Sequence, residues 1–309
     1  MDINFEYYKI FYYAAKYKNI TKAAAALGSN QPNVTRIIKL LESQLNCRLF
    51  IREPRGLSLT EEGEKLYSHV EIAYKHFMNA QEEISGQSDS SSGTIELGAT
   101  ETALHLLLLD AMRNFKANHP KIRIKVHNYS TPELIQFLNS GKIDFAVITT
   151  PFQTAKSFQC ETLYDFREIL VGGSQYQILC ERKLELQELK NYPLIGLGRG
   201  TATYDLYKDF FIAHDTDMEL DMEVASSDLM LPLIQSNLGI GFVPEDLALP
   251  LLQNYQLVQI HINDTIPLRS IQIVSDKGRR KSTAADALYQ YLRTEHKVKN
   301  SFQHPKSTE

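Results

Sequence analysis

The sequence predicts a multi-domain α/β protein with a small helical module, one long helix and a larger region of alternating strands and helices. The chain of 309 residues is longer than one typical domain. Apolar residues recur at helical spacing through roughly the first quarter of the chain, and short apolar segments alternate with helical ones from residue 94 onward. The composition, 43% hydrophobic and 23% charged, is that of a globular protein.

Residues 1–60 are predicted to form a winged helix-turn-helix. Aromatic and small residues repeat at helical spacing from Phe5 to Ala15, and an alanine-rich helix is expected from Thr21 to Leu27. Asn30 is a good N-cap for a third helix, whose apolar stripe ends at Leu45. The segment RLFIREPRGLSL, residues 48–59, predicts two short strands around a turn, which is the shape of a wing.

This first module is basic, although the whole chain is acidic. Residues 1–60 hold nine Lys or Arg against four Asp or Glu, whereas the net charge of the chain is −4. A basic module suits DNA, because neutralising phosphates releases counterions and supplies most of the non-specific affinity. A solvated basic face on a small helical unit would carry the same charge. Charge alone therefore does not distinguish DNA binding from this alternative.

The polar start of the third helix favours DNA binding. In a helix-turn-helix, the N-terminal residues of the second helix of the motif enter the major groove. Gln31 can pair with a base edge, and Thr35 and Arg36 are placed for phosphates. Helix capping explains Asn30 and Pro32, but not these residues together with the wing arginines. The predicted contacts to double-stranded DNA are Thr21, Asn30, Gln31, Pro32, Asn33, Thr35, Arg36, Lys39, Arg52 and Arg55.

A dimerising linker helix is expected over residues 61–88. Its apolar positions from Leu66 to Ile84 are separated by 4, 3, 4, 3 and 4 residues, the spacing of a coiled-coil seam. Such a seam needs a partner, and self-association into a homodimer or homotetramer is the default. Packing of the stripe on the same chain is the alternative. Residues 89–93 end a Ser- and Gly-rich segment that we expect to be a hinge.

Strands and helices alternate between residues 94 and 298, which predicts a parallel sheet with helices on both faces. The expected elements of the first part are strands 94–97, 122–127 and 143–148 and helices 103–117 and 132–140. A second set follows from about residue 165 to residue 266. One more strand and a closing helix come after it, and the polar residues 299–309 are expected to form a disordered tail.

Two segments resemble LysR-type transcriptional regulators: TKAAAALGSNQPNVTRIIKLLE, residues 21–42, and LFIREPRGLSLTEEG, residues 49–63. The family commonly has serines where this chain has Asn30 and Thr35, and Ala at Asn33, so the departures affect the operator sequence. The resemblance implies an effector domain like that of periplasmic binding proteins, built from two Rossmann-like subdomains. Subdomain I would comprise residues 94–163 and 268–298, and subdomain II residues 164–267.

In such a domain the effector lies between the subdomains, as the resemblance implies. Ligands of open sheets bind where strands end, because helix N-termini there present N–H groups. Short hydroxyls and one arginine suit a small carboxylate, although each Ser or Thr alone is also an ordinary N-cap. Glu101 would repel an anion and indicates an amine-bearing or otherwise polar ligand. The expected small-molecule effector contacts are Thr100, Glu101, Thr102, Ser130, Thr131, Thr149, Arg199 and Thr201.

Other classes of protein have less support. No apolar run is long enough to cross a bilayer, and the N-terminus does not have the pattern of a secretion signal. The three cysteines are widely separated, which favours a reducing interior, so we expect the protein in the cytoplasm. Motifs of hydrolases, metalloproteases and nucleotide-binding loops are not found, so we expect no enzyme activity, metal or cofactor. The alternative is a cytoplasmic small-molecule-binding protein or enzyme of α/β fold with an accessory basic domain, which leaves residues 1–60 unexplained.

Overall fold

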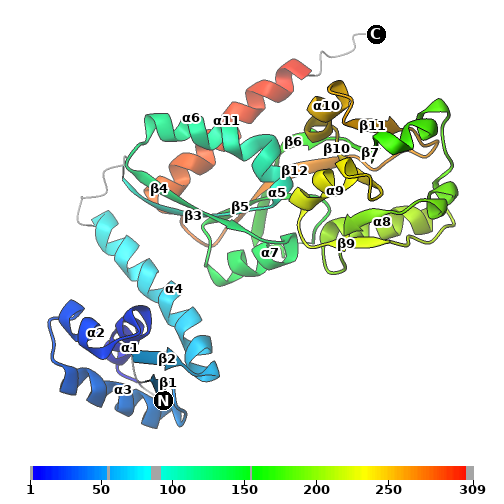
Figure 1. Ribbon diagram of the computed structural model, residues 1–309. Helices are drawn as coiled ribbons and strands as arrows, with labels where there is room; N and C mark the ends of the chain where they lie inside the picture. Colours follow the sequence, from blue (N-terminus) through cyan, green and yellow to red (C-terminus); the bar gives the residue numbers. More distant parts are fainter. Residues whose placement is uncertain (1–2, 54–55, 85–91, 154, 304–309) are drawn as a thin grey trace. The chain divides into compact units, whose positions relative to one another are not determined.

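The computed structural model describes residues 3–53, 56–84, 92–153 and 155–303, which fall into two compact units (Figure 1). The first unit spans Met1–Ser88 and the second Asp89–Glu309. The first contains the helix-turn-helix, the wing and the long helix. The second contains the alternating strands and helices.

Three helices form the core of the first unit: α1 (Phe5–Tyr17), α2 (Ile20–Ala26) and α3 (Gln31–Leu45). Helix α2 begins one residue earlier than the sequence predicts, because Asn19 is its N-cap and accepts a hydrogen bond from the Lys22 N–H at 3.0 Å. Side chains from all three helices are buried in one apolar cluster, which includes Phe11, Ala23 and Val34. The small alanines let α2 approach its neighbours closely.

The wing and the long helix complete this unit. Strands β1 (Phe50–Glu53) and β2 (Gly56–Leu59) pair antiparallel, as predicted, and the turn residues 54–55 lie outside the described residues. Helix α4 spans Glu61–Ile84. It follows Thr60, whose hydroxyl accepts a hydrogen bond from the Gly63 N–H at 3.0 Å. One side of α4 packs on α1 through aromatic rings, with Tyr12 and Tyr74 stacked at 4.5 Å between centroids.

Subdomain I of the second unit is a five-stranded sheet in the order β4-β3-β5-β12-β6. Its strands are β3 (Gly93–Ala99), β4 (Ile122–Asn128), β5 (Phe145–Thr149), β6 (Phe158–Phe166) and β12 (Arg269–Asp276). A helical run of α5 (Glu101–Ala103), a π-helical turn (Leu104–Leu108) and α6 (Leu109–Asn118) covers one face together with α11 (Thr283–Gln303). Helix α7 (Thr131–Ser140) covers the other face (Figure 1).

Subdomain II contains an antiparallel sheet in the order β10-β7-β11, made of β7 (Glu168–Gly173), β10 (Ile240–Pro244) and β11 (Leu257–Ile260). A parallel pair, β8 (Ile195–Leu197) and β9 (Met222–Val224), adjoins it through a bridge between Leu194 and Ile240. Its α-helices are α8 (Ala202–Ala213), α9 (Met230–Gln235) and α10 (Glu245–Gln253). Its 3-10 helices are Ser174–Glu181, Leu186–Asn191 and Ser227–Leu229.

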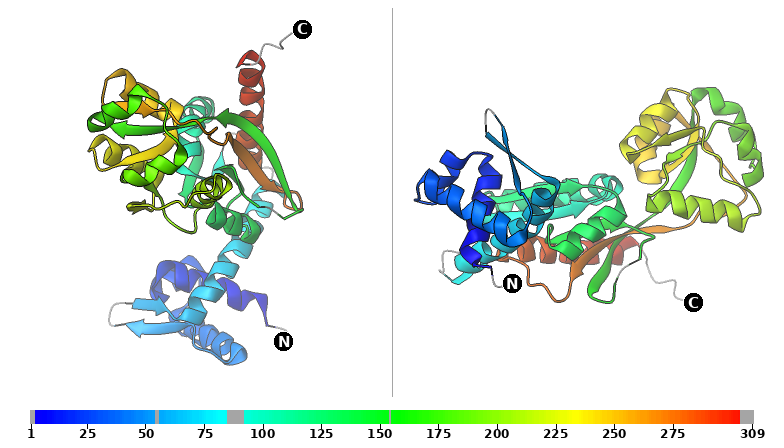
Figure 2. Two further views of the ribbon diagram at one scale, coloured as in Figure 1. Left: turned by 90° about the vertical axis from the view of Figure 1, so that its right-hand side faces the viewer. Right: turned by 90° about the horizontal axis from the view of Figure 1, so that it is seen from below.

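The chain crosses between the subdomains twice, before β7 and before β12 (Figure 2). The return of the last strand and helix to subdomain I agrees with what the resemblance implied. The sheet of subdomain I is mixed, however, because β12 runs antiparallel to both β5 and β6. Strand β6 stays in this sheet to Phe166, beyond the predicted boundary at residue 163.

The predicted hinge and the predicted tail, at the two ends of the second unit, can be compared with the structure only in part. Of the expected hinge, residues 89–91 lie outside the described residues, and β3 already begins at Gly93. Of the expected tail, residues 299–303 continue α11 and residues 304–309 are not described. No helix in the described part of the chain combines the length and the apolar character needed to cross a membrane.

Candidate functional site

The polar N-terminus of α3 is the first candidate site. Asn30 acts as its N-cap, since its side-chain oxygen accepts a hydrogen bond from the Asn33 N–H at 2.9 Å. Gln31 and Pro32 in the first turn are exposed. The Gln31 amide donates to the Thr21 hydroxyl, so it connects α3 to α2. Arg36, one turn later, donates to Asn33 Oδ1 at 3.1 Å. This exposed polar end has the chemistry that base and phosphate contacts require.

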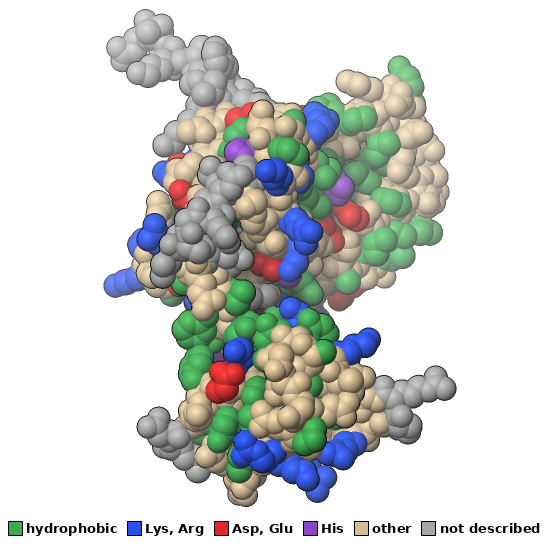
Figure 3. Space-filling view, turned by 90° about the vertical axis from the view of Figure 1, so that its left-hand side faces the viewer, with side chains coloured by type: hydrophobic (Ala, Val, Ile, Leu, Met, Phe, Trp, Pro, Cys, Tyr) green, Lys and Arg blue, Asp and Glu red, His purple; other side chains and the backbone are tan. Residues whose placement is uncertain are grey.

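A basic hollow lies between α3 and the wing. It measures about 580 Å³, and Thr35, Lys39, Arg48 and Arg52 are among its lining residues. Arg48 was not among the predicted contacts, and Arg55 lies outside the described residues. Lys and Arg side chains gather along the lower edge of the first unit in the space-filling view, where α3 lies in Figure 1 (Figure 3). A convex helix end beside a basic hollow suits the major groove and its flanking phosphates.

An apolar groove runs between α1 and α4. Its volume is about 250 Å³, and its lining includes four residues of the predicted seam, among them Val70 and Phe77. Phe77 is 49% exposed and touches Phe5, which is 59% exposed, with ring centroids 5.2 Å apart. Leu66 and Val70 also pack partly against the core of their own unit. Two large exposed aromatic rings in one groove are typical of a protein–protein contact.

The second unit contains a cavity of about 270 Å³ between its subdomains. The starts of three helical segments meet there: α5 after Thr100, α7 after Ser130 and α8 after Thr201. The predicted effector residues that line this cavity are Thr100, Glu101, Thr102, Ser130, Thr131, Thr149 and Thr201. Arg199, in the loop after β8, is exposed and does not line it. Asn128, Tyr129, Glu133 and Thr203 also line the cavity and were not predicted.

The hydroxyls in this cavity differ in their hydrogen-bond partners within the protein. Thr201 Oγ1 accepts a hydrogen bond from the Tyr204 N–H at 3.1 Å and donates to the Gly198 carbonyl at 2.9 Å, so it caps α8. Ser130 Oγ donates to Glu133 at 2.6 Å. In the part of the chain that the structure describes, Thr100 Oγ1 is buried without a hydrogen-bond partner. An unpaired buried hydroxyl costs free energy, so a ligand that binds it gains from the pairing.

Glu101 is connected to the opposite subdomain. Its carboxylate accepts hydrogen bonds from Ser226 Oγ at 2.7 Å, Ser227 Oγ at 2.8 Å and the Ser227 N–H at 2.6 Å. One turn later His105 lies 2.9 Å from Asp228. We expected the Glu101 charge to face a ligand, but it bridges the two subdomains instead, because the Ser226–Ser227 turn lies opposite it.

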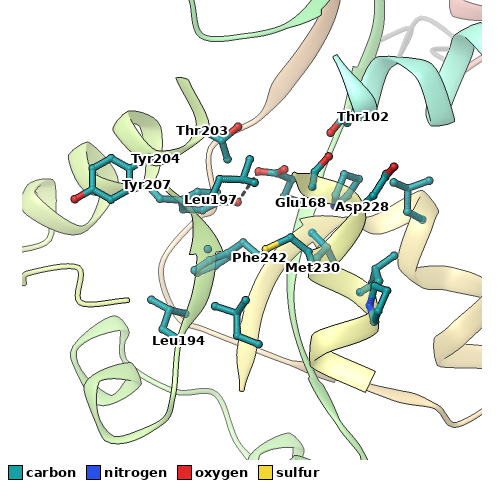
Figure 4. Close-up of a pocket in the computed structure, with 18 of the residues that line it drawn as sticks. Thr102, Glu168, Leu194, Leu197, Thr203, Tyr204, Tyr207, Asp228, Met230 and Phe242 are labelled. Atoms are coloured by element: carbon teal, nitrogen blue, oxygen red, sulfur yellow. Dashed lines mark hydrogen bonds between the residues drawn. The ribbon is translucent and has the colours of Figure 1, made fainter. Parts of the chain in front are cut away.

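A second, larger cavity of about 430 Å³ adjoins the first; most of its lining comes from subdomain II, with Thr102, His105 and Arg269 from subdomain I (Figure 4). Leucine, isoleucine, valine, methionine, proline and aromatic side chains form most of its wall. Arg269 and Glu168 also line it, and they form an ion pair at 2.8 Å with side chains only 2% and 4% exposed. The remaining Glu168 oxygen accepts a hydrogen bond from the Tyr207 hydroxyl at 2.5 Å. Burial and the neighbouring Glu168 carboxylate raise the pKa of Tyr207 well above its usual value, so Tyr207 remains a donor.

The sequence did not single out this ion pair. Arg269 and Glu168 are the first residues of β12 and β7, the two strands that follow the crossovers. A charged residue directly before an apolar run, as in REILVGG and RSIQIV, was the available signal. The two residues are 101 positions apart in the sequence and meet only in the folded chain. No local sequence pattern therefore predicts that they pair.

The fold and these sites define a class of protein: a DNA-binding module joined to a domain with a ligand-sized cavity between two α/β subdomains, as in a ligand-controlled transcriptional regulator. Comparison with known families agrees. The LysR substrate binding domain matches residues 88–297, and the bacterial regulatory helix-turn-helix protein, lysR family, matches residues 5–64. The chain therefore belongs to the LysR family of DNA-binding transcriptional regulators with an effector-binding domain.

Named relatives and solved structures match this chain over most of their own length. The HTH-type transcriptional regulator CitR of Bacillus subtilis (strain 168) is 24% identical over 272 residues, which cover 88% of this chain and 90% of CitR. The structure of full-length CbnR complexed with its target DNA has a TM-score of 0.66 at 18% identity, covering 94% of this chain and 99% of that one. The effector binding domain of QuiR in complex with shikimate has a TM-score of 0.59 at 20% identity, covering 67% and 98%.

Proposed function

We propose that a small polar effector, bound in the cavity between the subdomains, controls how this regulator binds its operator. The observation that carries this proposal is the convergence of three helix starts on a cavity with the unpaired hydroxyl of Thr100. Helix N-termini present N–H groups and the positive end of the dipole, which suits a carboxylate or another hydrogen-bond acceptor. The candidate contacts are Thr100, Thr102, Ser130, Thr131, Thr149 and Thr201.

The effector acts by changing the relative position of the two subdomains. Glu101 and Ser227 already connect subdomains I and II across the cavity. A ligand that contacts both sides favours the closed arrangement, but only by the difference between its affinities for the closed and open forms. The DNA-binding units then respond through the chain that joins them to this domain.

The DNA-binding unit reads its operator with the start of α3 and holds the backbone with basic side chains. Gln31, Pro32 and Asn33 face base edges in this proposal, and Thr35, Arg36, Lys39 and Arg52 contact phosphates. Thr21 and Asn30 position the helix: Thr21 binds Gln31, and Asn30 caps α3. A regulator of this kind works on the chromosome, so we place it in the cytoplasm.

The unit binds DNA as a homodimer, or as a homotetramer of two such dimers. The apolar groove between α1 and α4 supports this proposal, because Phe5 and Phe77 present apolar rings to solvent in it. Two copies would bury these rings against each other and place two recognition helices on one operator.

The test uses two substitutions with different expected effects. Thr100→Val is nearly isosteric and removes a hydroxyl without a protein partner, so stability should be unchanged or slightly higher while effector affinity falls. Thr201→Val removes the cap of α8 and should cost about 1 kcal/mol of stability.

A thermal-shift screen of small acids, amino acids and amines on the full chain identifies the effector, because a ligand of the folded state raises the melting temperature. Gel shifts then measure ligand-free DNA binding, which both variants should keep. Unchanged effector affinity in Thr100→Val would place the effector outside this cavity.

A further inference from the structure

The apolar cavity of subdomain II opens beside the cavity between the subdomains, where we propose that the effector binds. The two cavities share four lining residues: Thr102, Leu197, Thr203 and Ser227. Figure 4 shows Thr102 and Thr203 toward one end of the apolar cavity and Leu194 toward the other. A ligand held near Thr100 can therefore extend past Thr102 and Leu197 into subdomain II.

The wall of this second cavity offers little to a polar ligand. Leu194, Ile195, Met230, Phe242 and Val243 line it and are all less than 10% exposed. The charges on its wall are already paired. Arg269 donates to Glu168 and to the Thr150 carbonyl, both at 2.8 Å, and to the Thr203 hydroxyl at 3.1 Å. Because these groups satisfy one another, the cavity favours an apolar group that needs no hydrogen bonds.

The size of the cavity limits the apolar group. At roughly 30 Å³ per heavy atom, the liquid volume of a water molecule, the cavity has room for on the order of ten heavy atoms. This is the range of small-molecule pockets, which are mostly apolar with a few polar groups that fix orientation. A medium-length alkyl chain has the right bulk.

We infer that the effector is an amphipathic monocarboxylate, with its carboxylate in the cavity at Thr100 and its alkyl chain in the apolar cavity of subdomain II. This inference rests on the proposed effector site and specifies the class of compound that binds there. The cavity at Thr100, here called the head-group cavity, lies at the N-termini of α7 and α8, helices of 10 and 12 residues, which favour an anion. The carboxylates of Glu101 and Glu133 also line it and oppose an anion, but their oxygens already accept hydrogen bonds within the protein.

One carboxylate fits better than two charges or an amine. Among the described residues, no Lys or Arg lines the head-group cavity, and the Arg269 side chain in the adjoining cavity is already paired with Glu168. A second carboxylate at the far end of the ligand would lie among apolar side chains without a partner, which is unfavourable. The two carboxylates of the head-group cavity, Glu101 and Glu133, already accept hydrogen bonds from serines, so an ammonium group would compete with these contacts.

The test is calorimetric titration of the full chain with butanoate, hexanoate, octanoate and decanoate, each below its micelle-forming concentration. We expect affinity to rise roughly fifteenfold for each two carbons until the cavity is full, because each buried methylene strengthens binding about fourfold. Octanedioate, which has the length of octanoate and a carboxylate at both ends, should bind at least a hundredfold more weakly than octanoate.

Two leucines of α9 give a matched pair of variants. Leu231 lines the apolar cavity, whereas Leu233 lies two residues further on the same helix, is also half-buried and does not line it. Leu231→Gln should remove most of the dependence on chain length and leave butanoate affinity unchanged. Leu233→Gln should keep the dependence on chain length. Thr100→Val should weaken all four acids by a similar factor.

The outcomes separate this inference from the proposed site. Equal affinity for all four acids, or equal affinity for octanoate and octanedioate, overturns the inference even if the variants do not fold. If Thr100→Val still weakens butanoate in that case, the head-group site stands. Binding that Thr100→Val leaves unchanged, or no binding by any of these acids, overturns the monocarboxylate head group and the inference with it.

Discussion

Replacing Arg269 by Met should destabilise the effector-binding unit strongly, because it leaves the charge of Glu168 buried without its partner. The two side chains are 2% and 4% exposed and 2.8 Å apart. Arg269 also donates to Thr149 Oγ1 at 3.2 Å and to Thr203 Oγ1 at 3.1 Å, so it connects β5 and α8 to the crossover. Met keeps the apolar bulk of the side chain and removes the charge and all of these donors.

The expected loss is about 3 kcal/mol of unfolding free energy, the lower end of the range of about 3–5 kcal/mol for removing one partner of a buried pair. The lower end applies because the Tyr207 hydroxyl continues to donate to Glu168. A loss of this size is a large part of the roughly 5–15 kcal/mol that stabilises a typical domain. Adding Glu168→Leu to the variant should recover most of it, since no unpaired charge then remains.

Urea unfolding of the full chain, followed by circular dichroism, measures this loss. The matched control is Arg182→Met, which breaks an exposed Arg–Glu pair of subdomain II, where the Arg182 and Glu188 side chains are 59% and 32% exposed. Arg182→Met should change stability far less, because water solvates the remaining charge. Equal losses in Arg269→Met and Arg182→Met, or no recovery in the double variant, would refute the reasoning.

Other expected outcomes concern DNA, assembly and the bridge between subdomains. Gln31→Ala should relax discrimination between operator sequences by ~1–3 kcal/mol at one base pair. Arg36→Ala should instead weaken binding to all sequences and lower the slope of log affinity against log salt concentration by about 1. Gel shifts in which both variants behave alike would contradict this. The double change Val70→Asp and Phe77→Asp should disrupt self-association in sedimentation, and an unchanged oligomer would show that the groove is not an interface. Glu101→Gln weakens three charge-assisted hydrogen bonds and should speed hydrogen exchange of the Ser227 amide, with unchanged exchange as the contrary result.

Local features of the fold follow from the sequence. Asn19 and Asn30 cap their helices through bonds to residues three positions later, and the predicted wing strands pair as expected. The class of fold and the family are also confirmed. These features depend on neighbouring residues or on a motif in one continuous segment, so their signal is present in the order of amino acids.

Several elements of the second unit could not be predicted in this way. The strand β6 was missed, and the direction of β12 in the sheet was wrong. Strand direction depends on the end of the sheet at which the chain enters after a crossover, and periodicity carries no information about that. Arg199 looked suitable for the effector by its place after a strand, but the structure turns it to solvent.

The sequence by itself determined the DNA-binding motif, the helix caps and the presence of hydroxyls at strand ends, because each depends on contacts within a few residues. The tertiary structure alone decided that Glu101 bridges to Ser226 and Ser227, 125 and 126 residues away, and that Arg269 pairs with Glu168. It also decided that an apolar cavity adjoins the hydroxyl-lined one. Such contacts form only when folding closes long loops, and their partners are set by how whole subdomains pack.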